Sequence, residues 1–198
     1  MKRTRIFPVI LAAGDSSHLG YPKALASFDG KTAIAIAVEN CATLEPPIVV
    51  LGHRAARIRR AVPAGARVIV NRAWRKGQLS SLLAGLRLVP RGAPFLLYPV
   101  DQPLLDAKLM VRLVKAYATR SLRQRIVMPR FRRRAGHPIL CSGILRRELQ
   151  AARTAREVVY RDERRIRFVT VRSEAIWADF DSPSSYRRCL KLYRHLKN

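Results

Sequence analysis

Short apolar segments that alternate with helical segments constrain the fold of this chain more than any other feature. Each apolar segment is long enough for a strand and carries few polar side chains on either face. Strands with two apolar faces that alternate with helices indicate a mainly parallel sheet covered by helices on both sides. We therefore predict an α/β fold, a three-layer α/β/α sandwich with a mainly parallel, Rossmann-like sheet. The predicted strands are residues 7–11, 48–52, 67–70, 94–98, 126–128, 136–141 and 167–171.

Helices are expected between these strands, and the length of the chain favours one domain. Residues 31–44 are rich in alanine with apolar side chains at helical spacing, and the prolines that follow end this segment. Ser80 and Ser81 are placed to cap a helix that begins at Leu82. A chain of 198 residues can bury a substantial core, so we expect a single domain over 1–198. The other predicted helices are residues 53–62, 82–88, 107–119, 142–151, 154–160 and 183–196.

The chain is strongly basic, with 39 Lys and Arg residues against 13 Asp and Glu and a net charge of +26. Such a surface attracts nucleotides, phosphorylated substrates and polyanions. The basic residues are spread along the chain without interleaved aromatic residues, so we expect a solvated surface and no specific nucleic-acid binding. Residues 130–134 form the densest basic run, which is either a phosphate or nucleic-acid patch or the solvated tip of a hairpin.

Three cysteines, Cys41, Cys141 and Cys189, lie far apart and form neither a metal-binding nor a disulfide pattern. Their scattered positions predict free thiols in a reducing compartment. The short apolar run near the N-terminus leads directly into the first loop, and no segment approaches the length of a transmembrane helix. We therefore expect a cytoplasmic protein with no membrane partner.

The loop after the first predicted strand has the composition of a phosphate-binding site. Gly14 and Gly20 allow backbone N–H groups to approach an anion closely, and Lys23 can reach a phosphate as a point charge. The spacing matches neither the P-loop nor the dinucleotide fingerprint, so an ordinary strand-to-helix connection is the alternative. Parallel α/β sheets bind ligands at the carboxyl ends of their strands, where this loop, Asn71 and Asp101 are all expected.

Asp101 directly follows the fourth predicted strand and is held between Pro99 and Pro103. Magnesium in enzymes takes one or two carboxylates together with substrate phosphates, and Asp101 suits that role. The alternative is that Asp101 caps the helical segment that starts near Leu105.

A second acidic segment lies near the end of the chain, at Asp179 and Asp181. One of these two carboxylates is expected to complete a metal site with Asp101. The other can cap the terminal helix at Pro183, whose position suits a first helical turn. The sequence leaves open which of the two takes which role.

Five segments carry a resemblance to a known family. They are LAAGDSSHLGYPKAL at 11–25, NRAWRKGQLSSLLAGL at 71–86, PVDQPL at 99–104, GHP at 136–138 and DFDSP at 179–183. In this order they resemble the motifs of the MobA-like nucleotidyltransferases, especially the molybdenum-cofactor cytidylyltransferase branch. The resemblance covers most of the chain and implies a sheet of the nucleotide-diphospho-sugar transferase type.

The resemblance also implies roles for particular residues. Lys23, Asp101 and His18 would act in catalysis, and Asp101, Asp179 and Asp181 would hold Mg²⁺. Gln102 and His137 would contact the acceptor. The residues that would bind the nucleotide are Leu11, Ala12, Ala13, Gly14, Ser16, Gly20, Lys23, Asn71, Gly77, Ser80 and Ser81.

The reaction that the resemblance implies is transfer of a nucleotidyl group from a nucleoside triphosphate to a phosphorylated acceptor, with release of pyrophosphate. The LAAG start of the first loop favours CTP, and the molybdopterin cofactor is the expected acceptor, with a molybdoenzyme or its chaperone as a protein partner. His18 stands where the family usually has arginine, and a neutral histidine offers one donor instead of a fork. The alternatives are a sugar or alditol phosphate as acceptor, or a weakened protein that binds nucleotides or nucleic acid through its basic surface.

Overall fold

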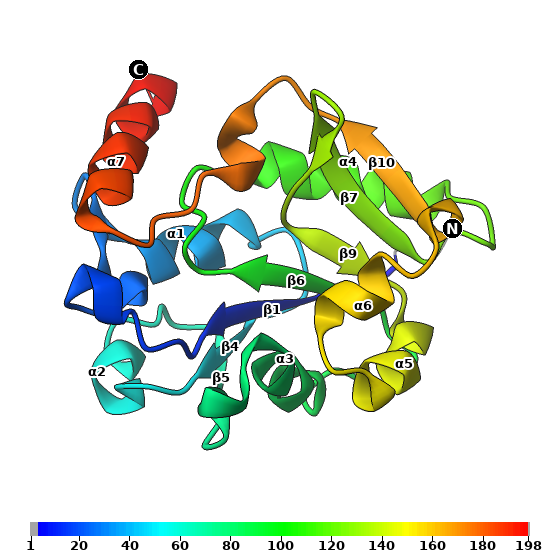
Figure 1. The fold of residues 1–198 in the computed structure, drawn as a ribbon, viewed down its shortest axis with the longest axis horizontal. Coiled ribbons are helices and arrows are strands. Elements are labelled where there is room, and N and C mark those ends of the chain that lie inside the picture. The colour runs from blue at the N-terminus through cyan, green and yellow to red at the C-terminus, as the bar shows by residue number, and fades with distance from the viewer. Residues whose placement is uncertain (1–3, 198) are drawn as a thin grey trace.

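One mainly parallel sheet runs through the middle of the molecule (Figure 1). The computed structural model describes residues 4–197, and within this range eight strands form the sheet in the order β10-β7-β9-β6-β1-β4-β5, with β8 paired to β7. Two further short strands, β2 (Ser27–Phe28) and β3 (Lys31–Thr32), form a separate hairpin. The strands of the main sheet are β1 Phe7–Ala12, β4 Ile48–Leu51, β5 Arg67–Val70, β6 Phe95–Pro99, β7 Ile126–Phe131, β8 Arg134–Ala135, β9 Ile139–Cys141 and β10 Ile166–Thr170.

Helices cover both faces of the sheet, as the apolar strands predict (Figure 1). Successive strand side chains enter opposite cores: Ile10 packs with the α1 and α4 side, and Val9 and Leu11 pack with the α3, α5 and α6 side. This arrangement confirms the three-layer α/β/α sandwich. The helices are α1 Ala33–Asn40, α2 Ala55–Arg59, α3 Gln78–Leu86, α4 Ala107–Ala118, α5 Arg146–Ala151, α6 Ala155–Val159 and α7 Pro183–Lys197.

Three predicted helix boundaries are wrong. The helix predicted over 31–44 begins only at Ala33, because Lys31 and Thr32 pair with β2 and the Thr32 hydroxyl accepts a hydrogen bond from the Ala35 N–H (3.3 Å). The helix predicted over 53–62 is limited to the five residues of α2. The helix predicted to follow Ser80 and Ser81 already begins at Gln78, so both serines lie inside α3.

The strand β9 lies inside the sheet and is antiparallel to both of its neighbours. Only Ile139–Cys141 of the predicted strand 136–141 forms β9, and β9 is antiparallel to both β6 and β7. The chain reaches β9 from β7 by a short hairpin and a three-residue connection without a helix, and a connection of that length reverses the strand direction.

The point where the chain changes direction across the sheet determines where a ligand can bind. From β1 the chain adds β4 and then β5 on one side, and afterwards returns to place β6 on the other side of β1. The carboxyl ends of β1 and β6 therefore diverge into loops on opposite faces. Such a topological switch point forms a crevice in open α/β sheets.

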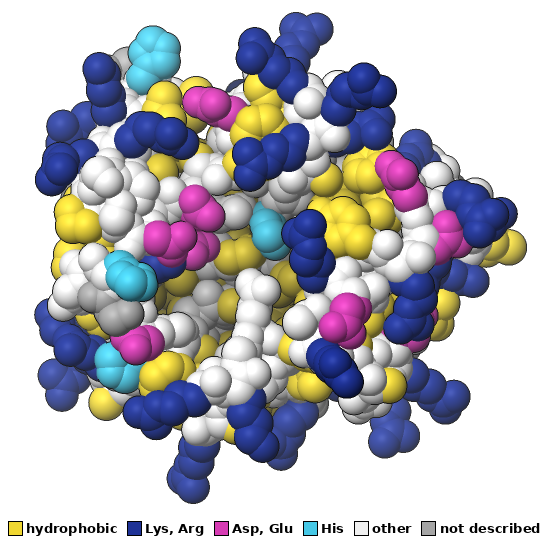
Figure 2. Space-filling view, viewed as in Figure 1, with side chains coloured by type: hydrophobic (Ala, Val, Ile, Leu, Met, Phe, Trp, Pro, Cys, Tyr) yellow, Lys and Arg dark blue, Asp and Glu magenta, His cyan; other side chains and the backbone are white. Residues whose placement is uncertain are grey.

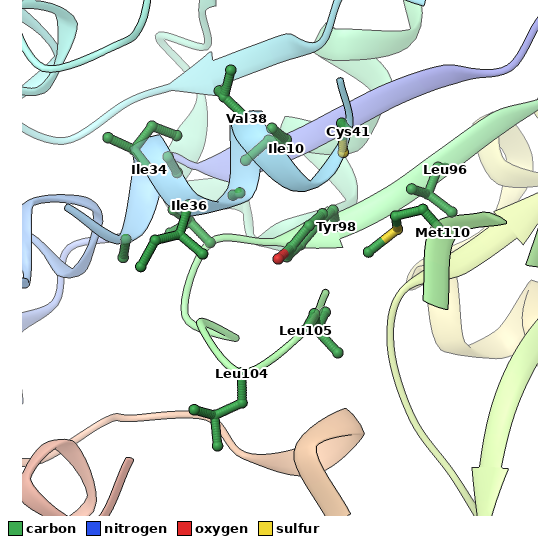
Figure 3. Close-up of a cluster of buried hydrophobic side chains, with 14 of the residues drawn as sticks. Ile10, Ile34, Ile36, Val38, Cys41, Leu96, Tyr98, Leu104, Leu105 and Met110 are labelled. Carbon is green, nitrogen blue, oxygen red and sulfur yellow. The ribbon is translucent and has the colours of Figure 1, made fainter. Parts of the chain in front are cut away.

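The loop after β6 is tied to the core beneath it. Figure 3 shows Tyr98 between Ile36 of α1 and Met110 of α4. Tyr98 is fully buried, and its hydroxyl donates to the Gln102 carbonyl (3.3 Å) and accepts from the Asn40 amide (3.2 Å). This buried polar contact fixes the backbone beside Asp101.

The three cysteines are free, as predicted, and the structure shows that they are buried. No helix within residues 4–197 combines the length and apolar character needed to cross a membrane.

Candidate functional site

A pocket of about 350 Å³ opens at the carboxyl ends of β1 and β6, at the switch point of the sheet. Figure 2 shows this face of the molecule, with a group of acidic side chains at the edge of a central hollow and Lys and Arg side chains around the rim. Of the predicted nucleotide-binding residues, Gly20, Asn71 and Ser80 do not line the pocket. Those that line it are Leu11, Ala12, Ala13, Gly14, Ser16, Lys23, Gly77 and Ser81.

Two hydrogen bonds hold the loop after β1 in shape. The Ser16 hydroxyl accepts a hydrogen bond from the Lys23 N–H (3.1 Å), and the Ala13 carbonyl accepts one from the His53 N–H (3.0 Å). Ser16 has a φ of 58°, a strained left-handed conformation for a residue with a side chain, and such strain concentrates at functional sites. No protein atom lies within 4 Å of the position that a Cβ would take at Gly14. Glycine therefore leaves this stretch of backbone open to a ligand.

A lysine and two aspartates meet at the mouth of the pocket. Lys23 Nζ lies 3.0 Å from Asp101 Oδ2 and also donates to Asp181 Oδ1. Burial by itself would lower the pKa of Lys23, but the two carboxylates together outweigh it and raise that pKa. Burial and the neighbouring charges of Asp181 and Asp101 raise the pKa of Asp179. The site thus gathers three carboxylates around one ammonium group.

These carboxylates fit a divalent ion that arrives with phosphate. Within the described part of the chain, no group of three or more His, Cys, Asp or Glu side chains is arranged to hold a metal ion unaided. Magnesium seldom needs such a cage, because it keeps waters and takes one or two carboxylates together with substrate phosphates. Asp101 and Asp181, which share the Lys23 ammonium, provide such a carboxylate pair.

The alternative roles considered for the aspartates are wrong. Asp106, and not Asp101, caps α4 by accepting a hydrogen bond from the Leu109 N–H (2.7 Å). At the start of α7 the Ser182 hydroxyl accepts from the Ser185 N–H (3.2 Å), so this cap uses neither Asp179 nor Asp181. All three carboxylates are left available to the site.

Asn71 and Ser80 support the pocket without lining it. The Asn71 amide donates to the hydroxyls of Ser80 (2.9 Å) and Ser81 (3.1 Å), and its carbonyl oxygen accepts from the Ala73 N–H (3.0 Å). The Ser80 hydroxyl lies within hydrogen-bond distance of the backbone carbonyls of Ala73 (2.9 Å) and Gly77 (3.0 Å). These contacts fix the loop before α3, so Asn71 and Ser80 position pocket residues rather than line the pocket.

Sequence reasoning missed Arg75 and Gln78, which both line the pocket. Arg75 stacks over the Trp74 ring with its guanidinium carbon 4.6 Å from the ring centre. Gln78 is the first residue of α3 and also lines a second, neighbouring cavity. The available signal for both residues was their position inside the segment 71–86, between Asn71 and Ser80.

The second cavity, of about 740 Å³, contains both residues predicted to contact an acceptor. Gln102 is 5% exposed, and its Nε2 lies 3.4 Å from His137 Nδ1. Burial lowers the pKa of His137, and the charge of Asp101 opposes this only in part, so the ring is held neutral. Gln102 Oε1 is buried and has no hydrogen-bond partner among the described residues, which leaves an acceptor for a ligand's N–H or O–H group.

His18 lies outside both cavities. It is exposed on a short 3₁₀ turn, Ser17–Leu19, and makes no polar side-chain contact within residues 4–197. Its predicted catalytic role stays a prediction.

Comparisons with known proteins agree with this geometry. Residues 8–170 match the family described as MobA-like NTP transferase domain. Nicotine blue oxidoreductase of Paenarthrobacter nicotinovorans is 33% identical over 146 residues, which cover 70% of this chain and 71% of that protein. The bifunctional protein GlmU of Cupriavidus taiwanensis is 33% identical over 110 residues, but these cover 54% of this chain and only 24% of GlmU.

A solved structure resembles nearly the whole chain. The crystal structure of Rv0371c from Mycobacterium tuberculosis has a TM-score of 0.83 at 26% identity, and the match covers 96% of this chain and 100% of that one. A complex of Rv0371c with manganese has a TM-score of 0.79 at 26% identity, and the match covers 95% of this chain and 99% of that one. A divalent ion therefore binds a close structural relative.

Proposed function

The chain belongs to the MobA-like NTP transferase family, and we propose that this nucleotidyltransferase moves CMP from CTP to the molybdopterin cofactor and releases pyrophosphate. The observation that carries the proposal is that two cavities adjoin at Gln78 and at the neighbouring residues Asp101 and Gln102. Asp101 lines the first cavity, the adjacent Gln102 lines the second, and Gln78 lines both. Two adjoining sites that share a lining residue suit a group transfer between two bound substrates.

In the first cavity we assign the triphosphate to the loop after β1. Its backbone N–H groups and the Lys23 ammonium would bind the phosphate oxygens, and Trp74 lies where the nucleoside would extend. Asp101 with Asp181 would hold Mg²⁺, which when bound supplies charge neutralisation to the phosphates. The manganese complex of Rv0371c supports a divalent ion in this role.

The transfer itself needs little covalent help from the protein. An oxygen of the acceptor phosphate attacks the α-phosphorus of CTP, the bond from that phosphorus to the bridging oxygen breaks, and pyrophosphate leaves with the electron pair. Positioning and electrostatic stabilisation dominate such reactions. Lys23 would stabilise the charge on the leaving pyrophosphate, and Gln102 would orient the acceptor through its free carbonyl oxygen.

The nucleotide and the acceptor are assigned by resemblance. The LAAG segment at residues 11–14 favours CTP over GTP by resemblance to the cytidylyltransferase branch. The acceptor is assigned by the same resemblance, and a sugar or alditol phosphate is the alternative. His18 in place of the family arginine predicts weaker transition-state stabilisation in either case.

A second candidate function follows from one comparison. The relative that matches about two thirds of each chain is named as an oxidoreductase acting on nicotine blue. An oxidoreductase that uses a nicotinamide dinucleotide could bind the dinucleotide's pyrophosphate on the same loop after β1. The test below therefore includes NADPH.

Titration calorimetry in the presence of Mg²⁺ tests the proposal, with CTP, GTP, ATP and NADPH as ligands. We expect CTP to bind only with Mg²⁺, and we expect Asp101→Ala to abolish this binding. Asp29→Ala is the control, because Asp29 pairs with Arg194 on the surface (2.8 Å) and lies outside both cavities. Metal-independent binding of NADPH alone would favour the oxidoreductase, and binding of no nucleotide would refute both. Pyrophosphate release with molybdopterin and with sugar phosphates then identifies the acceptor.

A further inference from the structure

The turn between β7 and β8 is built from residues that fit it poorly. Phe131 pairs with Arg134, so Arg132 and Arg133 alone form the turn. Their φ angles are 43° and 66°, both left-handed, as in the two-residue hairpin turns that favour Asn-Gly. Two arginines strain this turn more than Asn-Gly would, and retained strain of this kind points to a function for the side chains. We call residues 130–134 the arginine hairpin.

Arginines of the hairpin line the second cavity in fixed orientations. The guanidinium of Arg130 lies 4.3 Å from the centre of the Phe168 ring, and that of Arg134 lies 4.7 Å from the Trp177 ring. From α6, on another side of the cavity, Arg156 lies 4.9 Å from the Tyr160 ring. A guanidinium stacked on a ring keeps its N–H groups free at its edge, where they can bind an oxyanion.

The positive charge of these arginines is not neutralised by the protein. Within residues 4–197, no carboxylate forms an ion pair with Arg130, Arg133, Arg134 or Arg156, although all four line the cavity. The carboxylates that line the same cavity are Glu163 and Asp179, so positive charge is in excess. Guanidinium groups that line a cavity and have no ion-pair partner suit a phosphate-like ligand.

The backbone of the arginine hairpin lies two strands away from Asp101 in the sheet. Asp101 follows β6, whereas the hairpin includes the end of β7, and β9 lies between these strands. Neighbouring strands are about 4.8 Å apart, so the two strand ends are separated by about 10 Å. This spacing suits the two ends of a small phosphorylated molecule, with one end at Asp101 and the other at the hairpin.

We propose that the arginine hairpin and Arg156 bind a second anionic group of the acceptor, a phosphate or similar oxyanion distinct from the phosphate that is nucleotidylated. This inference rests on the proposed function, because it takes the second cavity as the acceptor site. The hairpin thereby selects acceptors that carry negative charge at both ends. The test must distinguish this specific binding from nonspecific attraction of anions, including nucleic acid, to the basic surface.

Inorganic phosphate is a suitable probe, with Trp177 as the reporter. The chain has two tryptophans, so Trp74→Phe leaves Trp177 alone beneath Arg134. We expect phosphate at constant ionic strength to change the Trp177 fluorescence in a saturable way. In the double variant R132N/R133G, the phosphate concentration at half-saturation should rise by about tenfold, because one charge-assisted contact and the turn geometry are altered. The same variant should melt about 2–4 °C higher, because the strain is relieved.

Two controls separate the possible outcomes. R91A/R147A removes the same number of positive charges around a different cavity and should leave phosphate binding unchanged. Lys23→Ala should also leave it unchanged, because Lys23 belongs to the first cavity. Equal weakening by R91A/R147A would mean general attraction, and loss of the signal only in Lys23→Ala would place the phosphate on the first loop. Either result overturns the proposal. Failure of CTP to bind would refute the proposed function without changing this titration.

Discussion

Lys23 Nζ lies 3.0 Å from Asp101 Oδ2, although 78 positions separate the two residues in the sequence. The contact closes the switch point of the sheet, because Lys23 follows the loop after β1 and Asp101 follows β6. The same ammonium also binds Asp181 from the segment before α7. In the proposed function, Lys23 would exchange carboxylate oxygens for phosphate oxygens when a nucleotide binds. Its contacts with Asp101 and Asp181 would then couple nucleotide binding to metal binding.

Lys23→Ala should affect metal and nucleotide in opposite directions. Without the ammonium, Asp101 and Asp181 lose a competing cation, so the affinity for Mn²⁺ alone should rise, by up to about fivefold. The affinity for CTP should fall by about 10- to 100-fold, because a charge-assisted contact to phosphate is lost. Electron paramagnetic resonance of free Mn²⁺ measures the first effect and calorimetry the second.

The control for this prediction is Lys31→Ala. Lys31 pairs with Glu39 on the surface (2.7 Å) and should change neither affinity. A parallel fall of both affinities in Lys23→Ala would show that the lysine supports the metal site instead of competing with it.

Asp179→Asn should stabilise the protein near neutral pH. Burial and the charges of Asp181 and Asp101 raise the pKa of Asp179, so its ionised form costs stability in the folded state. Because Asp179 is largely exposed, solvent screens this cost to no more than about 1 kcal/mol. Urea unfolding at pH 7 should show the gain, with Glu174→Gln as a control at an exposed carboxylate elsewhere.

The pH dependence of that gain has a definite sign. A raised folded pKa means that the folded protein binds more protons than the unfolded chain as the pH falls from 7 towards about 4. The wild type therefore recovers stability in this range, whereas Asp179→Asn does not, and the difference between them should shrink. A difference that grows on acidification would contradict the assigned cause.

The sequence was sufficient to predict the parts of the site that depend on strand ends. Apolar strands alternating with helices predict that the loop with Lys23 and the loop with Asp101 share one edge of a parallel sheet, and the structure joins the two side chains there. The apolar pattern of β9 does not reveal its direction, because a short apolar segment has the same pattern in a parallel and in an antiparallel strand. The signal was the connection from β7, which is too short for a helical crossover.

Side-chain contacts between distant segments were the harder part. Ser80 has the residue type of a cap, yet its hydroxyl is used by the loop before α3, since the helix begins two residues earlier. The basic run at 130–134 was correctly considered as a hairpin tip. That its arginines stack on Phe168 and Trp177 and face a cavity depends on how β10 and the segment before α7 pack beside it. No local pattern contains that information.

His18→Arg should strengthen nucleotide binding if the loop after β1 binds phosphate as proposed. His18 is exposed and makes no polar side-chain contact within residues 4–197, so the substitution breaks no interaction described there. An arginine offers a permanent charge and a fork of donors to the triphosphate, and the affinity for CTP should rise by about tenfold. Calorimetry checks this, with His195→Arg as the matched control, because His195 is exposed on α7 and lines neither cavity. Equal effects of the two variants would indicate only a more basic surface.

Alanine substitutions at Gly52 and Gly85 should distinguish a loss of stability from a loss of nucleotide binding. A Cβ at Gly52 would lie 2.6 Å from the Ala13 carbonyl oxygen and 2.7 Å from Trp74 Cβ, both parts of residues that line the first cavity. A Cβ at Gly85 would lie 2.5 Å from a Val9 methyl group, away from that cavity.

Overpacking of this size costs about 1–3 kcal/mol, so Gly52→Ala and Gly85→Ala should both lower the free energy of unfolding. The alanine at position 85 recovers part of its cost through better helix propensity. At a temperature where both variants are folded, only Gly52→Ala should bind CTP more weakly, because it displaces the backbone of Ala13. Urea unfolding and calorimetry on the same samples provide the comparison. Equal CTP affinity in the two variants would show that the backbone at Ala13 does not contact the nucleotide.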